Sequence, residues 1–220
     1  MPDNVIAELQ NRIKSLENEV RTLKDIEAIE RLQRTYGYYL EHWMAQDIID
    51  LFSDCEGVSL TLSAGTYLGK TGVRKYFERL NPDNEFLHQV MQLSGVVDVD
   101  ADGKNATGRW YGFGAISIKR GKGVGQSFMS GIYISDYVKE DGIWKFKTLK
   151  FEQFYTAKPL EGWVKPDRLG NSPVVNQQPG LVDTSLPRVS CRITGKLYPP
   201  FSVADPSLPT DLPSCQWPEA

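Results

Sequence analysis

The feature that most limits the fold of this sequence is a long series of strand patterns that follows helical ones. Apolar residues recur at helical spacing through residues 25–41, and shorter helical patterns follow at 47–52 and 70–80. After a short hairpin pattern at 60–68, long alternating segments occupy residues 90–100, 106–119, 126–139 and 143–155. This order predicts an α+β fold with an antiparallel sheet that carries helices on one face. A strongly curved sheet would close around the three helices and leave a pocket between them.

The first 24 residues show a different pattern, a heptad stripe typical of a helix that pairs with another helix. The apolar residues of the stripe alternate at spacings of three and four: Ile6, Leu9, Ile13, Leu16, Val20 and Leu23. β-branched residues at one seam position and Leu at the other favour a pair over a trimer, if the helices run parallel. The alternative is an amphipathic helix that lies on its own domain. The sequence leaves the two open.

The C-terminal region, residues 158–220, again has a different composition. Eleven of the 13 prolines lie between Pro159 and Pro218, and apolar residues such as Trp163 and Trp217 persist among them. We expect an extended strap that packs over the domain or a neighbouring subunit, with a disordered tail as the alternative. The predicted organisation is therefore a helix over 1–24, a domain over 25–157 and a strap over 158–220.

Composition excludes several classes of function. A net charge of −3 gives no electrostatic basis for binding nucleic acid, and the apolar runs are too short to span a membrane. Three cysteines, an odd number without metal-like spacing, indicate the cytoplasm as the compartment. Two histidines and unclustered carboxylates predict no bound metal. The glycine-rich loop at 121–125 joins two strands and lacks the Gly-Lys-Ser/Thr end of a phosphate-binding loop, so no nucleotide cofactor is expected.

Titratable and aromatic side chains are densest at the end of the predicted core helix. Tyr36 lies on the apolar face of that helix, so its hydroxyl needs a partner inside the fold. Glu41 lies five residues further on, about 140° around an ideal helix, and reaches the same pocket only near the helix end. His88 precedes a strand that should line the interior, and a Glu41–His88 pair would tune the imidazole as a general base. Trp43 is expected in the same pocket and His42 outside it. A purely structural histidine is the alternative for His88.

Strand alternation suggests further binding residues on the sheet. Trp144, Phe146, Thr148, Lys150 and Glu152 share one face of their strand. Because this face changes from aromatic to polar, Lys150 and Glu152 are candidates for a cavity mouth, or form an ion pair on a solvated face. On the strand over 106–119, Arg109 and Tyr111 share a face and could bind a carboxylate or phenolate. Arg109 could equally pair with a helix carboxylate.

Several stretches resemble SnoaL-like proteins of the nuclear transport factor 2-like superfamily over roughly residues 10–155. They are Arg12-Ile13-Lys14-Ser15-Leu16-Glu17, residues 25–32, Ala106-Thr107-Gly108-Arg109-Trp110 and residues 136–144. The pattern is similar to that of the bile acid 7α-dehydratases and, more distantly, of scytalone dehydratase. The resemblance implies a cone-shaped α+β fold in which a curved sheet surrounds three helices.

Within this likeness, Tyr36 matches the helix tyrosine of the dehydratases, Glu41 stands in place of their aspartate, and His88 occupies the region of their catalytic histidine. Gly114 stands where they have an acidic residue, which counts against steroid dehydration.

The resemblance implies a cofactor-independent lyase that acts on a bulky hydroxylated aromatic or polycyclic molecule. Loss of water and loss of formaldehyde are both open. The proline-rich extension and residues 91–95 bear a faint likeness to the lignin-related diarylpropane γ-formaldehyde lyases. The alternatives are a non-catalytic small-molecule-binding protein and an isomerase of the same fold. We expect a homo-oligomer, a dimer or a trimer, because the heptad stripe and the strap would otherwise leave apolar patches in water.

Overall fold

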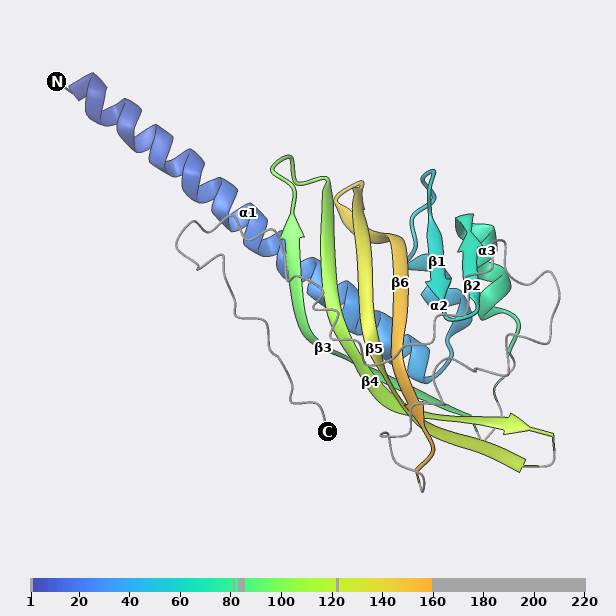
Figure 1. Ribbon diagram of the computed structural model, residues 1–220. Helices are drawn as coiled ribbons and strands as arrows, with labels where there is room; N and C mark the ends of the chain where they lie inside the picture. Colours follow the sequence, from blue (N-terminus) through green and yellow to red (C-terminus); the bar gives the residue numbers. More distant parts are fainter. Residues whose placement is uncertain (1, 81, 83–85, 122, 160–220) are drawn as a thin grey trace, which may run out of the picture.

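The computed structural model describes residues 2–80, 82, 86–121 and 123–159 of the chain (Figure 1). Its elements, in chain order, are α1 (Pro2–Glu41), α2 (Ala45–Asp50), β1 (Ser59–Leu62), β2 (Gly65–Leu68), α3 (Gly69–Phe77), β3 (Leu87–Val99), β4 (Asn105–Arg120), β5 (Gly123–Glu140) and β6 (Ile143–Ala157). The predicted α+β class and the curved sheet with helices are confirmed. The expected strap lies, from residue 160 on, outside the described residues.

Six strands form one curved sheet in the order β2-β1-β6-β5-β4-β3. The four long strands pair antiparallel as neighbours in sequence, as the meander predicts. One pair departs from the expected antiparallel sheet, because β1 runs parallel to β6, with Leu60 opposite Leu149. A parallel pair needs a long connection, and here α3 and the whole meander separate the two strands.

Helix α1 is a single element of 40 residues, whereas the change of pattern at Asp25 suggested two helices. The chain contains no proline or glycine between residues 3 and 36 that would interrupt the helix. From Asp25 onward one face of α1 is buried against the sheet, including Ile29 and Leu40. The first half projects beyond the sheet (Figure 1). Among the described residues, no helix combines the length and the apolar character needed to cross a membrane.

The alternation of β6 reverses within the strand, which corrects the predicted cavity wall. Tyr137 of β5 pairs with Phe146 of β6, but the preceding Asp136 pairs with Thr148, so that Lys147 is an extra residue. Because side chains alternate with a period of two, one inserted residue exchanges the two faces of the strand. Beyond the bulge, the buried residues are Leu149 and Phe151. The predicted shared face from Trp144 to Glu152 therefore does not exist.

Candidate functional site

A cavity of about 130 Å³ lies between the C-terminal end of α1, α3, the start of β3 and the inner face of β4–β6. Its walls are mostly aromatic and aliphatic, as is usual for a small-molecule site. The polar side chains that line it are Tyr36, Ser63, Tyr76, Arg79, His88, Ser127, Tyr133, Gln153 and Thr156. Three of the residues predicted from the sequence, Tyr36, Trp43 and His88, are thus brought together around one cavity.

Trp43 forms part of the cavity wall through an unusual backbone conformation. It follows the end of α1 with a φ of +49°, in a region that a bulky side chain rarely adopts. The strain is offset by burial of the ring, which is 4% exposed, and by a hydrogen bond from its Nε1 to the carbonyl oxygen of Phe77 at 2.8 Å. Strained residues of this kind are held where the surroundings fix them, often at functional sites. Here the conformation fastens the end of α1 to α3.

His88 enters the cavity from β3 and is held by aromatic rings. Its ring centroid lies 5.6 Å from that of Trp43 and 6.3 Å from that of Phe86, on which it stacks. Its buried Nδ1 has no hydrogen-bond partner among the described residues. Burial lowers the pKa of His88 from 6.5 to about 4, and the positive charge of Arg79 also lowers it. The imidazole is therefore neutral near pH 7 and able to accept a proton.

Arg79, which the sequence analysis missed, is the only Lys or Arg among the described residues that line the cavity. Its Nη1 donates to the carbonyl oxygen of Tyr76 at 2.8 Å, and its guanidinium lies 3.6 Å from the centroid of the Tyr76 ring. The buried Nε has no partner among the described residues. A guanidinium fixed in this way can stabilise a negative charge on a ligand. The sequence feature that could have indicated Arg79 is its position, three residues after Tyr76 at the end of a helix with an apolar face.

Phenol groups complete the polar lining. Burial raises the pKa of Tyr36 far above 10, and the neighbouring Tyr133 and Tyr76 add to the effect. Burial likewise raises the pKa of Tyr133, whose hydroxyl is hydrogen-bonded to the side chain of Gln92. Both phenols therefore stay protonated and can donate hydrogen bonds to a bound oxygen. Tyr36 is 2% exposed and makes edge contacts with Tyr133, Phe77 and Phe146.

The predicted Glu41–His88 pair is absent. Glu41 accepts a hydrogen bond from Nε2 of Gln89 at 3.1 Å, and it does not line the cavity. Successive residues of a strand point to opposite faces, so Gln89 lies on the face of β3 away from His88. The rotation of about 140° between Tyr36 and Glu41 carries the carboxylate past the cavity instead of into it.

The other predicted binding residues also lie elsewhere. Tyr111 is 53% exposed, because the inner face of β4 consists of Trp110, Gly112 and Gly114, and Arg109 shares the outer face with Tyr111. The expectation that Tyr111 and Arg109 face the ligand is therefore wrong. Lys150 and Glu152 pair with each other, and their side chains are 45% and 25% exposed. The bulge at Lys147 turns them away from the cavity, where neither is a lining residue.

Gly114 has a structural reason to lack the acidic side chain of the dehydratases. A Cβ at this position would lie 1.7 Å from the carbonyl oxygen of Gln89 in β3, which is impossible without moving the strand. The close approach of β3 and β4 leaves no room for any side chain here. The polar inner-face residues Gln153 and Thr156, also missed from the sequence, occupy the end of β6 instead.

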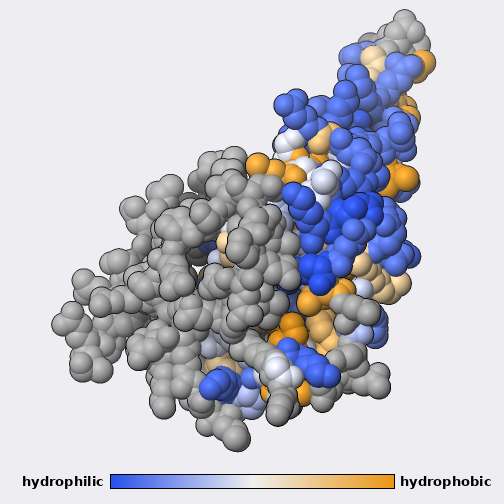
Figure 2. Space-filling view, turned by 90° about the vertical axis from the view of Figure 1, so that its right-hand side faces the viewer, coloured by the Kyte–Doolittle hydropathy of each residue, from blue (hydrophilic) through white to orange (hydrophobic). Residues whose placement is uncertain are grey.

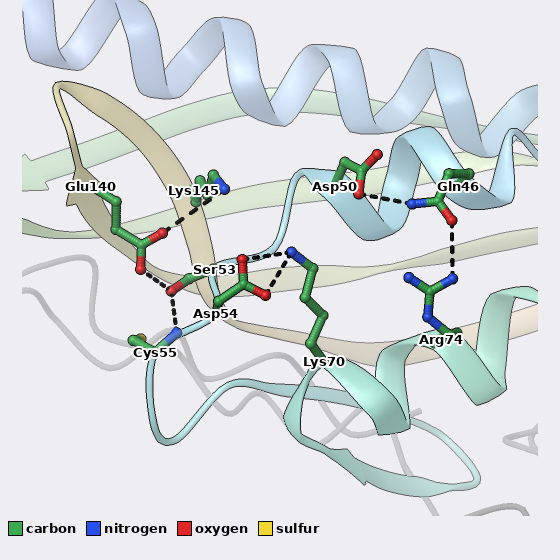
Figure 3. Close-up of polar contacts among 9 residues, drawn as sticks. All are labelled: Gln46, Asp50, Ser53, Asp54, Cys55, Lys70, Arg74, Glu140 and Lys145. Carbon is green, nitrogen blue, oxygen red and sulfur yellow. Dashed lines mark hydrogen bonds and ion pairs between the residues drawn. The ribbon is translucent and has the colours of Figure 1, made fainter.

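A second polar cluster lies outside the cavity, around the loop after α2 (Figure 3). Ser53 Oγ donates to Glu140 and accepts from the backbone nitrogen of Cys55 at 2.8 Å, while Lys70 pairs with Asp54 at 2.9 Å. These groups satisfy one another and tie the loop to the turn between β5 and β6. This arrangement is structural. Within the described part of the chain, no group of three or more His, Cys, Asp or Glu side chains could hold a metal ion.

Comparison with known proteins identifies similar domains. The family model described as "SnoaL-like domain" matches residues 21–150 of this chain. That range begins in α1 just before its buried half and ends within β6, so it contains His88, Arg79 and most of the cavity lining.

Solved structures are similar at low sequence identity. A protein of Novosphingobium aromaticivorans, provisionally described as a scytalone dehydratase, matches 63% of this chain and 90% of its own, with 21% identity and a TM-score of 0.52. The Kfla4162 protein of Kribbella flavida matches 62% of this chain and 95% of its own, with 15% identity and a TM-score of 0.50. A type 2 hexachlorocyclohexane dehydrochlorinase matches 63% and 91%, with 18% identity and a TM-score of 0.49. At these identities the similarity of the first two, whose TM-scores reach 0.50, shows the fold alone.

Proposed function

The chain belongs to the family of SnoaL-like domains, and from this premise we propose that it is a cofactor-independent lyase acting on a hydroxylated aromatic molecule. The fold alone does not fix the reaction, since one fold can host many activities. The observation that carries the proposal is a neutral histidine and an arginine in one aromatic cavity, each with a buried nitrogen that lacks a partner among the described residues. A bound substrate would supply those partners.

In this proposal His88 moves a proton while Arg79 stabilises negative charge. For loss of water, Nδ1 of His88 takes a proton from the carbon next to the one that bears the hydroxyl. The C–H electrons form the double bond, the C–O bond breaks, and the departing hydroxide receives its proton from the phenol of Tyr36. The imidazolium then returns its proton to Tyr36, which restores the site. Each proton-transfer group of this kind typically contributes about 10²–10⁴-fold in rate.

Loss of formaldehyde is the second version of the same chemistry. His88 would take the O–H proton of a hydroxymethyl arm, the C–C bond would break, and formaldehyde would leave. The electron pair would form a double bond as hydroxide departs from the neighbouring carbon. The hydroxide would take the proton held by His88, so that water is released as well and the neutral imidazole is restored. Arg79 would stabilise the developing alkoxide in the first step.

The dimensions of the site bear on the substrate. A cavity of about 130 Å³ is close to the size that accommodates one benzene ring. A larger hollow of about 460 Å³ adjoins it and shares Phe86, Ile116 and Ser127 in its lining. We therefore propose that one ring occupies the cavity, with any second ring of a bulkier substrate in the adjoining hollow.

A binding protein without activity is the second candidate, and the position of Glu41 favours it. With no carboxylate partner among the described residues, and with a pKa of about 4, His88 is a weaker base than one tuned near neutral pH. The same cavity could hold a phenolate or carboxylate against Arg79 without converting it. An isomerase would use His88 without a leaving group.

The test is to incubate the purified protein with hydroxylated one-ring and two-ring aromatics, with and without a chelator, and to identify products by mass spectrometry. A product lighter by one water, with or without formaldehyde, in both conditions supports the lyase. A product of unchanged mass indicates the isomerase. Ligands that bind, by calorimetry, and are recovered unchanged indicate the binding protein.

A further inference from the structure

The first half of α1 carries an apolar face that nothing in the described chain covers. Ile6, Leu9, Ile13, Leu16, Val20 and Leu23 are between 48% and 66% exposed. We refer to these six residues as the seam. Figure 2 shows hydrophobic side chains spaced along the projecting helix among strongly hydrophilic ones. Such a contiguous apolar stripe in water indicates a missing partner.

The seam has the composition of one particular kind of partner surface. Its first heptad position holds only β-branched residues (Ile6, Ile13 and Val20), and its fourth holds only leucine (Leu9, Leu16 and Leu23). This arrangement favours a coiled coil of two parallel helices over one of three or four. We propose that α1 helices of two copies of this chain pair along the seam as a parallel coiled coil, which makes the protein a homodimer.

The charged residues beside the seam favour pairing with a second copy of the helix that runs parallel to the first. In a parallel coiled coil, the residue just before each first heptad position of one helix faces a residue of the other helix. That residue has a sequence number higher by five. Arg12 then faces Glu17 of the second copy, and Glu19 faces Lys24. Both pairs are attractive, so that the helix is complementary to itself.

The position of the seam on α1 permits the pairing. On an ideal helix, the seam points about 180° away from the face that Ile29, Tyr36 and Leu40 bury against the sheet. A partner helix therefore approaches from the side that the sheet leaves open. Beyond Leu23 the heptad positions are polar, with Glu27 and Glu30, and Glu30 pairs with Arg34 at 2.6 Å. The apolar seam ends where α1 joins the domain.

The first experiment measures the mass of the full chain by light scattering at micromolar concentration. We expect the mass of two chains, and of one chain for Leu16→Glu. Asn18→Glu adds the same charge away from the seam and should remain a dimer. Circular dichroism should show both variants folded, since Leu16 is 52% exposed and lies outside the core of the described residues. A wild-type mass of one chain or of three chains overturns the proposal in favour of a monomer or a trimer. A dimer that Leu16→Glu leaves unchanged also overturns it, because another segment would then cover the seam.

The second experiment tests direction. Arg12→Glu and Glu17→Arg each place like charges opposite one another in a parallel pair, so each should raise the dimer dissociation constant several-fold. The double variant restores the attraction and should recover the wild-type constant. An antiparallel pair would instead bring residue 12 near residue 19, and the double variant would remain weakened, which overturns the parallel arrangement.

Discussion

The two ends of the buried half of α1 differ in how their polar side chains are hydrogen-bonded. We call the end near Gln33 the packed end and the end beside the cavity the cavity end. At the packed end, the Tyr137 hydroxyl donates to Gln33 Oε1 at 2.8 Å and accepts from Trp110 Nε1 at 3.0 Å, and Gln33 Nε2 donates to Gln92 at 2.8 Å. At the cavity end, His88 Nδ1 and Arg79 Nε have no partner among the described residues. Both ends are built mainly from aromatic residues on the same helix and sheet.

The difference separates side chains that stabilise the fold from side chains available to a ligand. A buried polar group without a partner costs about 1–3 kcal/mol, so unsatisfied groups are rare unless they serve a purpose. Among the described residues, the packed end has two such atoms, Asp25 Oδ2 and Ser135 Oγ. The other oxygen of the Asp25 carboxylate accepts from Trp144 Nε1 at 2.9 Å and from Lys139, and Ser135 lies beside the Tyr137 hydroxyl. At the cavity end the two unsatisfied nitrogens belong to neighbouring side chains that face one space, as expected of groups that await a ligand.

The largest effect should come from the histidine at the cavity end. His88→Gln keeps an amide in the cavity but cannot accept and return a proton, so turnover should fall by about 10²-fold or more. The matched control is His42→Gln, since His42 is exposed and outside the cavity lining. Steady-state kinetics on a substrate identified by the product screen provide the measurement. Equal turnover in the two variants would place the chemistry away from His88.

The same residue should make the stability of the protein depend on pH. The pKa of His88 is about 4 in the folded chain, against the ordinary histidine value of 6.5 in the unfolded chain, so between these two pH values only the unfolded chain is extensively protonated. Stability from this group is complete above pH 6.5 and decreases as the pH falls towards 4, by an amount on the order of 3 kcal/mol. Urea unfolding at pH 7.5 and 4.5 should show a larger loss for the wild type than for His88→Gln. Identical losses would mean that His88 is solvated in the folded protein.

The packed end should respond to substitution in stability and not in turnover. Tyr137→Phe removes one hydroxyl and leaves Gln33 and Trp110 each short of a buried partner, which should cost about 1–3 kcal/mol of unfolding free energy. Tyr38→Phe is the control, because Tyr38 is 69% exposed. Chemical denaturation measures the cost, and kinetics should show unchanged turnover in both variants. A loss of turnover in Tyr137→Phe at full stability would show that the packed end takes part in the chemistry.

The sequence was sufficient for the order of elements and for the buried face of α1. Helical periodicity placed Tyr36 on the buried face correctly, because an uninterrupted helix keeps its phase over several turns. The continuity of α1 was missed, since a change of hydrophobic pattern looks like a helix boundary even where no residue breaks the helix. The parallel β1–β6 pair was missed because strand order depends on contacts far apart in sequence.

Site residues on strands were harder to place, for a physical reason. Alternation assigns faces only as far as the next bulge, and the bulge at Lys147 exchanged the faces of β6 with no glycine or proline to mark it. On β4 the small residues Gly112 and Gly114 form the inner face, where they make room for the rings of Tyr133 and Phe151 and for the backbone of β3. The polar side chains of β4, which suggested binding residues, therefore lie on the outer face. Arg79 was missed because its role depends on the packing of α3 against the turn at Trp43.

The smallest effect is expected from the pair that the bulge turned outward. Lys150 and Glu152 form an ion pair on the outer face of β6, with Lys150 nearly half exposed. Water and salt screen such pairs, so Lys150→Met and Glu152→Gln should each change the unfolding free energy by less than about 1 kcal/mol. Turnover should stay at the wild-type value, because neither side chain lines the cavity. The comparison with Gln153→Ala, which removes a cavity-lining amide next to Glu152, is the most local test of the bulge. If Glu152→Gln lowered turnover and Gln153→Ala did not, the register of β6 beyond Lys147 would be wrong and the predicted mouth would be restored.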